Sequence, residues 1–120
     1  MNEPSEGQSL LGQSETQMRK GMLVYCVLLL CKDGKVYSSE IIRRLHEAEL
    51  IVVEGTLYPL LTRLKNNGLL TYNWVESTSG PPRKYYVLSP EGRKVLEQLD
   101  STWAELSLAV ATALEGRNLN

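Results

Sequence analysis

Apolar residues recur at helical spacing along much of the chain, most clearly in residues 55–66. There Leu57, Leu60, Leu61 and Leu64 follow the i, i+3, i+4, i+7 order that places side chains on one face of a helix. The pattern predicts an amphipathic helix whose leucine face packs on a core and whose opposite, polar face is turned outward.

Three further helices are expected around this one. Residues 14–31 are apolar on nearly all sides, which predicts a helix covered on more than one face. Residues 38–48 carry a shorter apolar face and begin with two serines and an acid, a favourable helix start. Residues 51–53 are too rich in β-branched side chains to continue that helix well. The last helix follows the Ser-Pro-Glu start signal at 89–91.

Between the third and fourth helices the pattern changes to that of strands. Residues 70–75 and 84–88 carry aromatic and β-branched side chains, which predicts a hairpin. The connecting residues 76–82 are rich in turn formers and too many for a tight turn. The order helix, helix, helix, strand, strand, helix is that of a winged helix-turn-helix. The predicted fold class is therefore mainly α with a small β-hairpin, a winged helix-turn-helix followed by a long C-terminal dimerisation helix.

These patterns divide the chain into three parts. Residues 1–13 are polar and rich in Gly, Ser and Gln, so a flexible acidic arm is expected there. Residues 14–89 form the predicted winged helix-turn-helix domain, which would bind DNA. Residues 90–116 form the predicted dimerisation helix.

The polar face of the third helix and the start of the second strand carry side chains that suit nucleic acid. Hydroxyl, amide and cationic groups can donate to phosphates or reach base edges. The pair Arg83-Lys84 follows a Gly-Pro-Pro turn, where a wing would meet the DNA backbone. An ordinary solvated helix face and a solubilising pair of charges are the alternative interpretations. The candidate DNA-binding residues are Ser38, Thr56, Tyr58, Thr62, Arg63, Lys65, Asn66, Arg83 and Lys84.

The last helix is expected to be close to 40 Å long, more than a domain of this size can cover. Its apolar residues step by three and four, as in a coiled-coil seam, which favours pairing with a second copy over folding back. Trp103 lies in the middle of this seam, where two copies could enclose a slot for a planar ligand or simply fill the dimer core. The candidates for this interface or ligand site are Met18, Met22, Tyr25, Leu96, Leu99, Trp103, Leu106 and Val110.

The net charge bears on DNA binding only when it is counted separately for each segment of the chain. The formal net charge of −1 excludes a strongly basic chain, the simplest signature of a nucleic-acid binder. However, residues 1–17 hold three acids and no bases, whereas residues 18–88 hold ten bases and six acids. A modestly basic body with weak non-specific DNA binding is therefore expected.

The remaining composition narrows the class of protein. Cys26 and Cys31 are five residues apart, which places them on different faces of a helix, so they cannot bridge each other. Two unpaired cysteines fit a reducing compartment. The longest apolar run is well short of a membrane span, and the polar start does not suit a signal peptide, so a cytoplasmic protein without membrane contact is expected. With a single histidine, the chain offers little for a metal site or a catalytic triad, so no metal, cofactor or enzymatic activity is expected.

Three segments together resemble the PadR family of bacterial transcriptional regulators over about residues 17–110. They are Tyr37-Ser-Ser-Glu-Ile-Ile-Arg-Arg-Leu45, Glu54-Gly-Thr-Leu-Tyr-Pro-Leu-Leu-Thr-Arg-Leu64 with Gly68-Leu69, and Arg83-Lys-Tyr-Tyr-Val-Leu-Ser-Pro-Glu-Gly92. The family's more usual Gly-Tyr-Glu is replaced by Tyr37-Ser38-Ser39-Glu40, so the second helix could start differently.

The resemblance implies a homodimeric winged-helix DNA-binding protein, usually a repressor. Its third helix would enter the major groove and its wing would touch the backbone of a pseudopalindromic double-stranded operator. The single final helix is similar to that of the small subclass of the family, whose multidrug-responsive members bind flat aromatic compounds between paired tryptophans on the last helix. Trp103 falls at the expected position.

The resulting hypothesis is a homodimeric repressor whose DNA affinity is modulated by a small planar hydrophobic ligand. The first alternative is a winged-helix dimer that binds a protein partner and no DNA, since fold alone does not decide function. An enzyme ranks last, because His46 on a helix surface is a poor start for a catalytic site.

Overall fold

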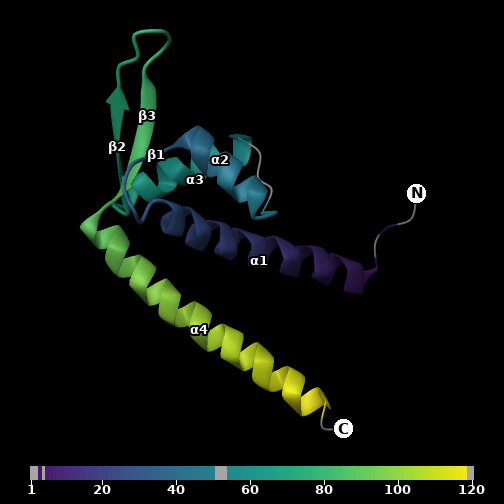
Figure 1. Cartoon of the computed structure of the whole chain (residues 1–120). Coiled ribbons are helices and arrows are strands. Elements are labelled where there is room, and N and C mark those ends of the chain that lie inside the picture. The colour runs from purple at the N-terminus through teal and green to yellow at the C-terminus, as the bar shows by residue number, and fades with distance from the viewer. Residues whose placement is uncertain (1–2, 4, 51–53, 119–120) are drawn as a thin grey trace.

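The computed structural model of the chain describes residues 3, 5–50 and 54–118 (Figure 1). The order of elements confirms the predicted winged-helix class, with one additional short strand ahead of the second helix. The elements are α1 (Glu6–Leu30), β1 (Val36–Tyr37), α2 (Ser38–Glu47), α3 (Glu54–Asn66), β2 (Leu70–Val75), β3 (Arg83–Leu88) and α4 (Pro90–Asn118).

The sheet is antiparallel with the strand order β1-β3-β2, so β3 is central. Tyr86 pairs with Tyr72 of β2, and Lys84 pairs with Trp74, which places these four side chains on one face of the sheet. Strand β1 was not predicted, because two residues are too few to show an alternating pattern. It extends the hairpin where Tyr37 pairs with Tyr85.

The core lies between the three N-terminal helices and one face of the sheet. All four leucines of the α3 pattern are buried, as the spacing predicts. They share a cluster with Leu28 of α1, Ile41 of α2 and Tyr86 of β3. The face of α3 opposite these leucines is therefore held outward.

Helix α1 begins at Glu6, so the expectation of a helix from about Ser14 preceded by an arm over residues 1–13 is wrong for residues 6–13. The physical reason is a capping box: the Gln8 amide N–H donates to Ser5 Oγ (3.1 Å), and the Ser5 N–H donates to Gln8 Oε1 (3.2 Å). The expectation for residues 51–53 lies outside the described residues.

A compact junction joins the end of α3 to the start of α4. Ser89 Oγ donates to the Gly68 carbonyl (2.6 Å) and accepts the Gly92 amide N–H (2.9 Å). Ser89 N–H also donates to the Leu69 carbonyl (3.0 Å). Gly68 has a φ of 79°, a left-handed conformation that ends α3 and suits glycine. One buried serine thus caps α4 and satisfies the turn that follows α3.

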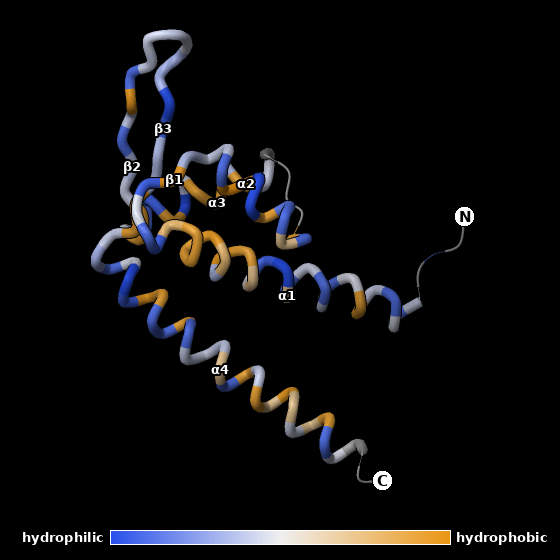
Figure 2. Tube along the Cα trace, in the orientation of Figure 1, coloured by the Kyte–Doolittle hydropathy of each residue, from blue (hydrophilic) through white to orange (hydrophobic). Residues whose placement is uncertain are grey.

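Helices α1 and α4 leave the body and diverge from each other (Figure 1). The radius of gyration is 18.0 Å, whereas a compact chain of this length has about 14 Å. The 29 residues of α4 extend over about 43 Å. Apolar positions continue along the free half of α4 (Figure 2). None of the described helices is long and apolar enough to cross a membrane.

Where α1 and α4 are still close, Tyr25 Oη donates a hydrogen bond to Asp100 Oδ1 (2.5 Å). This hydrogen bond, with a smaller effect of partial burial, raises the pKa of Tyr25 from 10.0 to about 12. The phenol therefore remains a donor that ties the two helices together over the whole neutral range.

The Gly92→Ala substitution should lower the free energy of unfolding by about 3 kcal/mol, because a Cβ at this position would overlap the carbonyl oxygen of Leu69. Gly12→Ala is the matched control: it lies in α1 with open space around it and should stabilise the helix by up to about 1 kcal/mol. Chemical denaturation of the two variants measures both effects, and equal stabilities would contradict this description of the junction.

The Asp100→Ala substitution should return the pKa of Tyr25 from about 12 towards 10.0, because it removes the acceptor that favours the protonated phenol. Because the pKa is raised by folding, the contribution to stability is present below pH 10 and is lost as pH rises through about 12. Phenolate absorbance against pH measures the shift, with Tyr25→Phe identifying the residue. Coincident titrations of wild type and Asp100→Ala would refute the assignment.

Candidate functional site

The start of α2, the outer face of α3 and the start of β3 form one continuous polar surface. Ser38 Oγ lies 3.4 Å from Tyr58 Oη of α3. Arg83 Nη2 of β3 donates to Ser39 Oγ (3.4 Å). The expectation that these serines cap α2 is therefore corrected: Tyr37 is the N-cap residue, and both hydroxyls contact neighbouring elements instead.

Arg83 is held against this surface by an aromatic ring. Its guanidinium carbon lies 3.8 Å from the centroid of Tyr37, a cation–π contact. Tyr37 in turn meets Tyr85 edge-on, with ring centroids 6.3 Å apart. An exposed arginine that would otherwise sample many rotamers thus has a fixed platform.

Lys84 occupies the opposite face of the sheet, because neighbouring residues of a strand point to opposite sides. Its Nζ lies 4.0 Å from the centroid of Tyr72 and 5.6 Å from those of Trp74 and Tyr86. The basic pair is therefore not one contact point at the tip of the wing. The tip is formed by residues 76–82, and the two cations flank its base from two sides.

The other predicted DNA-binding residues are exposed on α3, and one of them reaches the wing. The Nζ of Lys65 lies 5.4 Å from the Tyr72 ring centroid, so the last turn of α3 and the wing meet on one tyrosine. The exposed residues of this face are Thr56, Tyr58, Thr62, Arg63, Lys65 and Asn66.

Four residues of this surface were not predicted: Tyr37, Ser39, Tyr72 and Trp74. The alternation of the hairpin would have placed Tyr72 and Trp74 beside Lys84 once the register was known. Tyr37 and Ser39 had no comparable signal, because their role depends on the two-residue strand β1.

The cations of this surface are free to bind an external anion. Within the described part of the chain, the one salt bridge joins Arg43 and Glu47, one turn apart on α2. Neither Arg83 nor Lys84 has a carboxylate partner there. Aromatic rings orient these cations without neutralising them, which suits donation to phosphate oxygens.

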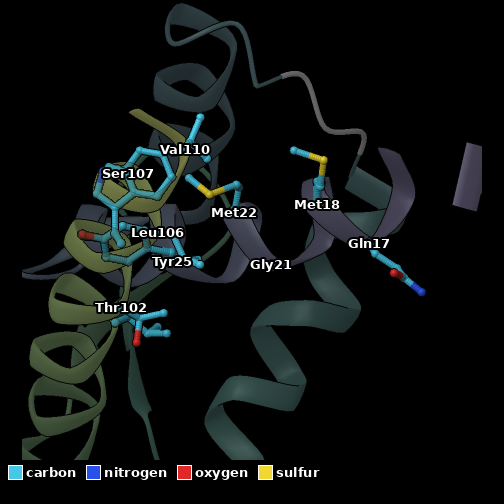
Figure 3. A pocket seen from close by; sticks show the side chains of 11 residues that line it. Gln17, Met18, Gly21, Met22, Tyr25, Thr102, Leu106, Ser107 and Val110 are labelled. Atoms are coloured by element: carbon cyan, nitrogen blue, oxygen red, sulfur yellow. The ribbon is translucent and has the colours of Figure 1, made fainter. Parts of the chain in front are cut away.

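A second feature is an apolar groove between α1 and α4, with a volume of about 700 Å³ (Figure 3). In the close-up, Gln17 and Met18 lie at the end away from α4, whereas Tyr25 and Leu106 approach from the two helices. The groove is lined by Gln17, Met18, Gly21, Met22, Tyr25, Leu99, Thr102, Trp103, Leu106, Ser107 and Val110.

Seven of the eight residues predicted for the interface or ligand site line this groove. Leu96 is the exception and is a correction: it is 3% exposed and belongs to the core of its own domain, because the first turns of α4 pack on that core. The free part of the seam is open, with Trp103 47% and Leu106 55% exposed.

The lining residues that were not predicted are Gln17, Gly21, Thr102 and Ser107. They are polar or small, so the apolar pattern used for the seam passes over them. Helical spacing could have identified these residues as part of the groove. Gln17 and Gly21 lie one turn apart, and so do Trp103 and Ser107.

Comparison with known proteins identifies the family of this chain. The profile described as "Transcriptional regulator PadR-like family" matches residues 27–98. An uncharacterised protein of Lysinibacillus sphaericus is 31% identical over 91 residues, which are 74% of this chain and 83% of that protein.

Solved structures agree with this assignment. A PadR-like transcription factor of Bacteroides fragilis is 59% identical, with a TM-score of 0.72, over 82% of this chain and 95% of that chain. A PadR family transcriptional regulator of Eggerthella lenta is 31% identical, with a TM-score of 0.76, over 90% and 95% of the two chains. The chain therefore belongs to the PadR-like family of transcriptional regulators, which are winged-helix DNA-binding proteins and not enzymes.

Proposed function

We propose that this protein is a cytoplasmic homodimeric repressor that binds a pseudopalindromic operator, with an affinity set by a small planar apolar ligand. The observation that carries the proposal is the groove between α1 and α4. One wall of this groove is α4, and Ser89, the residue before α4, is hydrogen-bonded to Gly68 in the turn after α3. One rigid connection thus joins the proposed ligand site to the proposed DNA reader.

On the DNA side, α3 is the major-groove reader. Its outer face offers hydroxyls, an amide and two cations, which suit base edges and phosphates. Arg83 and Lys84 flank the wing and add backbone contacts. Two copies of α3 would read half-sites about 34 Å apart, one turn of the duplex.

The exposed apolar length of α4 supports pairing with a second copy. Trp103, Leu106 and Val110 are all exposed on the free half of this helix, a surface that a stable monomer seldom leaves in water. A two-fold partner would cover the seam and close the open side of the groove, with one Trp103 from each copy.

Ligand binding would act through the geometry of α4. The ligand changes DNA affinity only if it binds one dimer arrangement better than the other. A flat aromatic molecule between the two Trp103 rings would alter the separation or angle of the α4 helices. Because Ser89 and Gly92 tie α4 to the turn after α3, that change would move the two readers relative to each other.

Arg83→Ala and Lys84→Ala should each weaken binding to all DNA sequences alike, and each should reduce the slope of log K against log salt by about 1. Gel-shift titrations over a salt series, with the DNA upstream of the protein's own gene and with a mixed-sequence duplex, measure both quantities. Lys94→Ala, at a solvent-facing position on α4, is the charge-matched control. An unchanged slope in both wing variants would disprove these contacts.

Trp103→Ala should weaken binding of anilinonaphthalene sulfonate, a flat apolar dye, by about tenfold, because it removes the largest wall of the groove. Dye fluorescence titration measures the affinity. Trp74→Ala is the matched control, since Trp74 lies on the wing and is equally an exposed tryptophan.

Leu106→Glu tests the dimer in a separate measurement. A carboxylate in the apolar seam should convert the dimer to a monomer, which light scattering detects. Equal dye affinity of the two tryptophan variants would exclude the groove as the ligand site. A wild-type protein that is monomeric at micromolar concentration would exclude the proposed dimer.

A further inference from the structure

Two lysines from different elements share one aromatic ring on the inner face of the wing. Lys65 comes from the last turn of α3 and lies with its Nζ 5.4 Å from the centroid of Tyr72. Lys84 comes from β3 and lies 4.0 Å from the same centroid. The ring therefore brings together an ammonium group of the proposed reading helix and one of the wing.

This arrangement concentrates positive charge without neutralising it. Two ammonium groups on one ring repel each other, and the face of the tyrosine only partly offsets that repulsion. Within the ranges that the structure describes, neither lysine forms a salt bridge. An anion within reach of both lysine side chains would relieve the repulsion and accept hydrogen bonds from both.

The third member of this cluster is an exposed tryptophan. Trp74 is 62% exposed, although it is among the largest apolar side chains, and its ring lies 5.6 Å from the Nζ of Lys84. It shares the sheet face of Tyr72 and Lys84, because Trp74 and Lys84 are cross-strand partners. A flat apolar surface thus adjoins the two cations.

We infer that Lys65 and Lys84 grip one backbone phosphate of duplex DNA together, while the indole of Trp74 packs against the adjoining deoxyribose. This inference rests on the proposed DNA binding. It assigns how the protein holds the DNA strand that passes between α3 and the wing. The combination of cation, cation and apolar plane matches the alternation of charged phosphate and apolar sugar along that strand. Tyr72 is a positioning residue, since it orients both lysines and need not touch the DNA.

A double-mutant cycle tests whether the phosphate is shared. The wild type, Lys65→Gln, Lys84→Gln and the double variant are titrated with a mixed-sequence duplex, because phosphate contacts do not depend on sequence. Each single variant should lose about fivefold in affinity, and the double variant about tenfold, well below the product of the two losses. Lys94→Gln on α4 is the charge-matched control and should lose less than twofold.

Tyr72→Leu tests the positioning role with both charges retained. Loss of the ring should lower DNA affinity by about as much as one lysine substitution, and it should weaken the coupling between Lys65 and Lys84 in a repeated cycle. Thermal unfolding of this variant confirms that the sheet is intact. If Tyr72→Leu fails to fold, the double-mutant cycle of Lys65 and Lys84, which leaves Tyr72 in place, decides the proposal.

The tryptophan contact has its own optical readout, because Trp74 and Trp103 are the only tryptophans of the chain. DNA should quench the emission of wild type and of Trp103→Phe, but not that of Trp74→Phe. Trp74→Ala should weaken binding without changing the salt slope, since it removes an uncharged contact.

The outcomes separate this inference from the function on which it rests. If wild type shows no salt-dependent DNA binding, both are overturned. If wild type binds and the lysine losses multiply, or if both lysine variants behave like Lys94→Gln, the shared phosphate is overturned while DNA binding stands. Quenching that persists in Trp74→Phe overturns the tryptophan contact.

Discussion

The arrangement of the molecule depends on the two hydrogen bonds that the Ser89 hydroxyl makes. The hydroxyl donates to the carbonyl of Gly68, behind α3, and accepts the amide N–H of Gly92, in the first turn of α4. The close approach of Gly92 to Leu69 leaves no room for a side chain and no freedom for the two backbones to slide. The direction of α4 is thereby set by the end of the helix that would read DNA.

That constraint explains how a small chain can hold two candidate binding surfaces far apart and still connect them. The leucine face of α3 and the first turns of α4 share one core, which includes Leu64 and Leu96. Beyond that core, α1 and α4 diverge and leave the apolar groove between them. Packing ends where the body ends, so apolar residues on the free half of α4 stay exposed. The proposed second copy would cover them.

On the candidate DNA-binding surface, aromatic rings hold the cations in place. Arg83 lies on Tyr37 and Lys84 on Tyr72, on opposite faces of the sheet. An aromatic ring orients a cation and leaves its charge available, whereas a carboxylate partner would neutralise that charge. This makes a chain with a net charge of −1 compatible with phosphate binding. Residues 18–88 hold ten bases against six acids, so the winged-helix body is more basic than the whole chain.

The sequence by itself determined the winged-helix order, the buried leucine face of α3, the cap at Ser89 and seven of the groove residues, because these follow from local spacing and capping chemistry. It misplaced the start of α1, where the Ser5–Gln8 capping box is hidden among glycines and polar residues. Only the tertiary structure decided that Arg83 and Lys84 serve opposite faces and that Leu96 belongs to the core. It also decided that Lys65 and Lys84 meet on Tyr72. The physical reason is that strand register and helix docking set these contacts between residues far apart in the chain, and local periodicity carries no information about them.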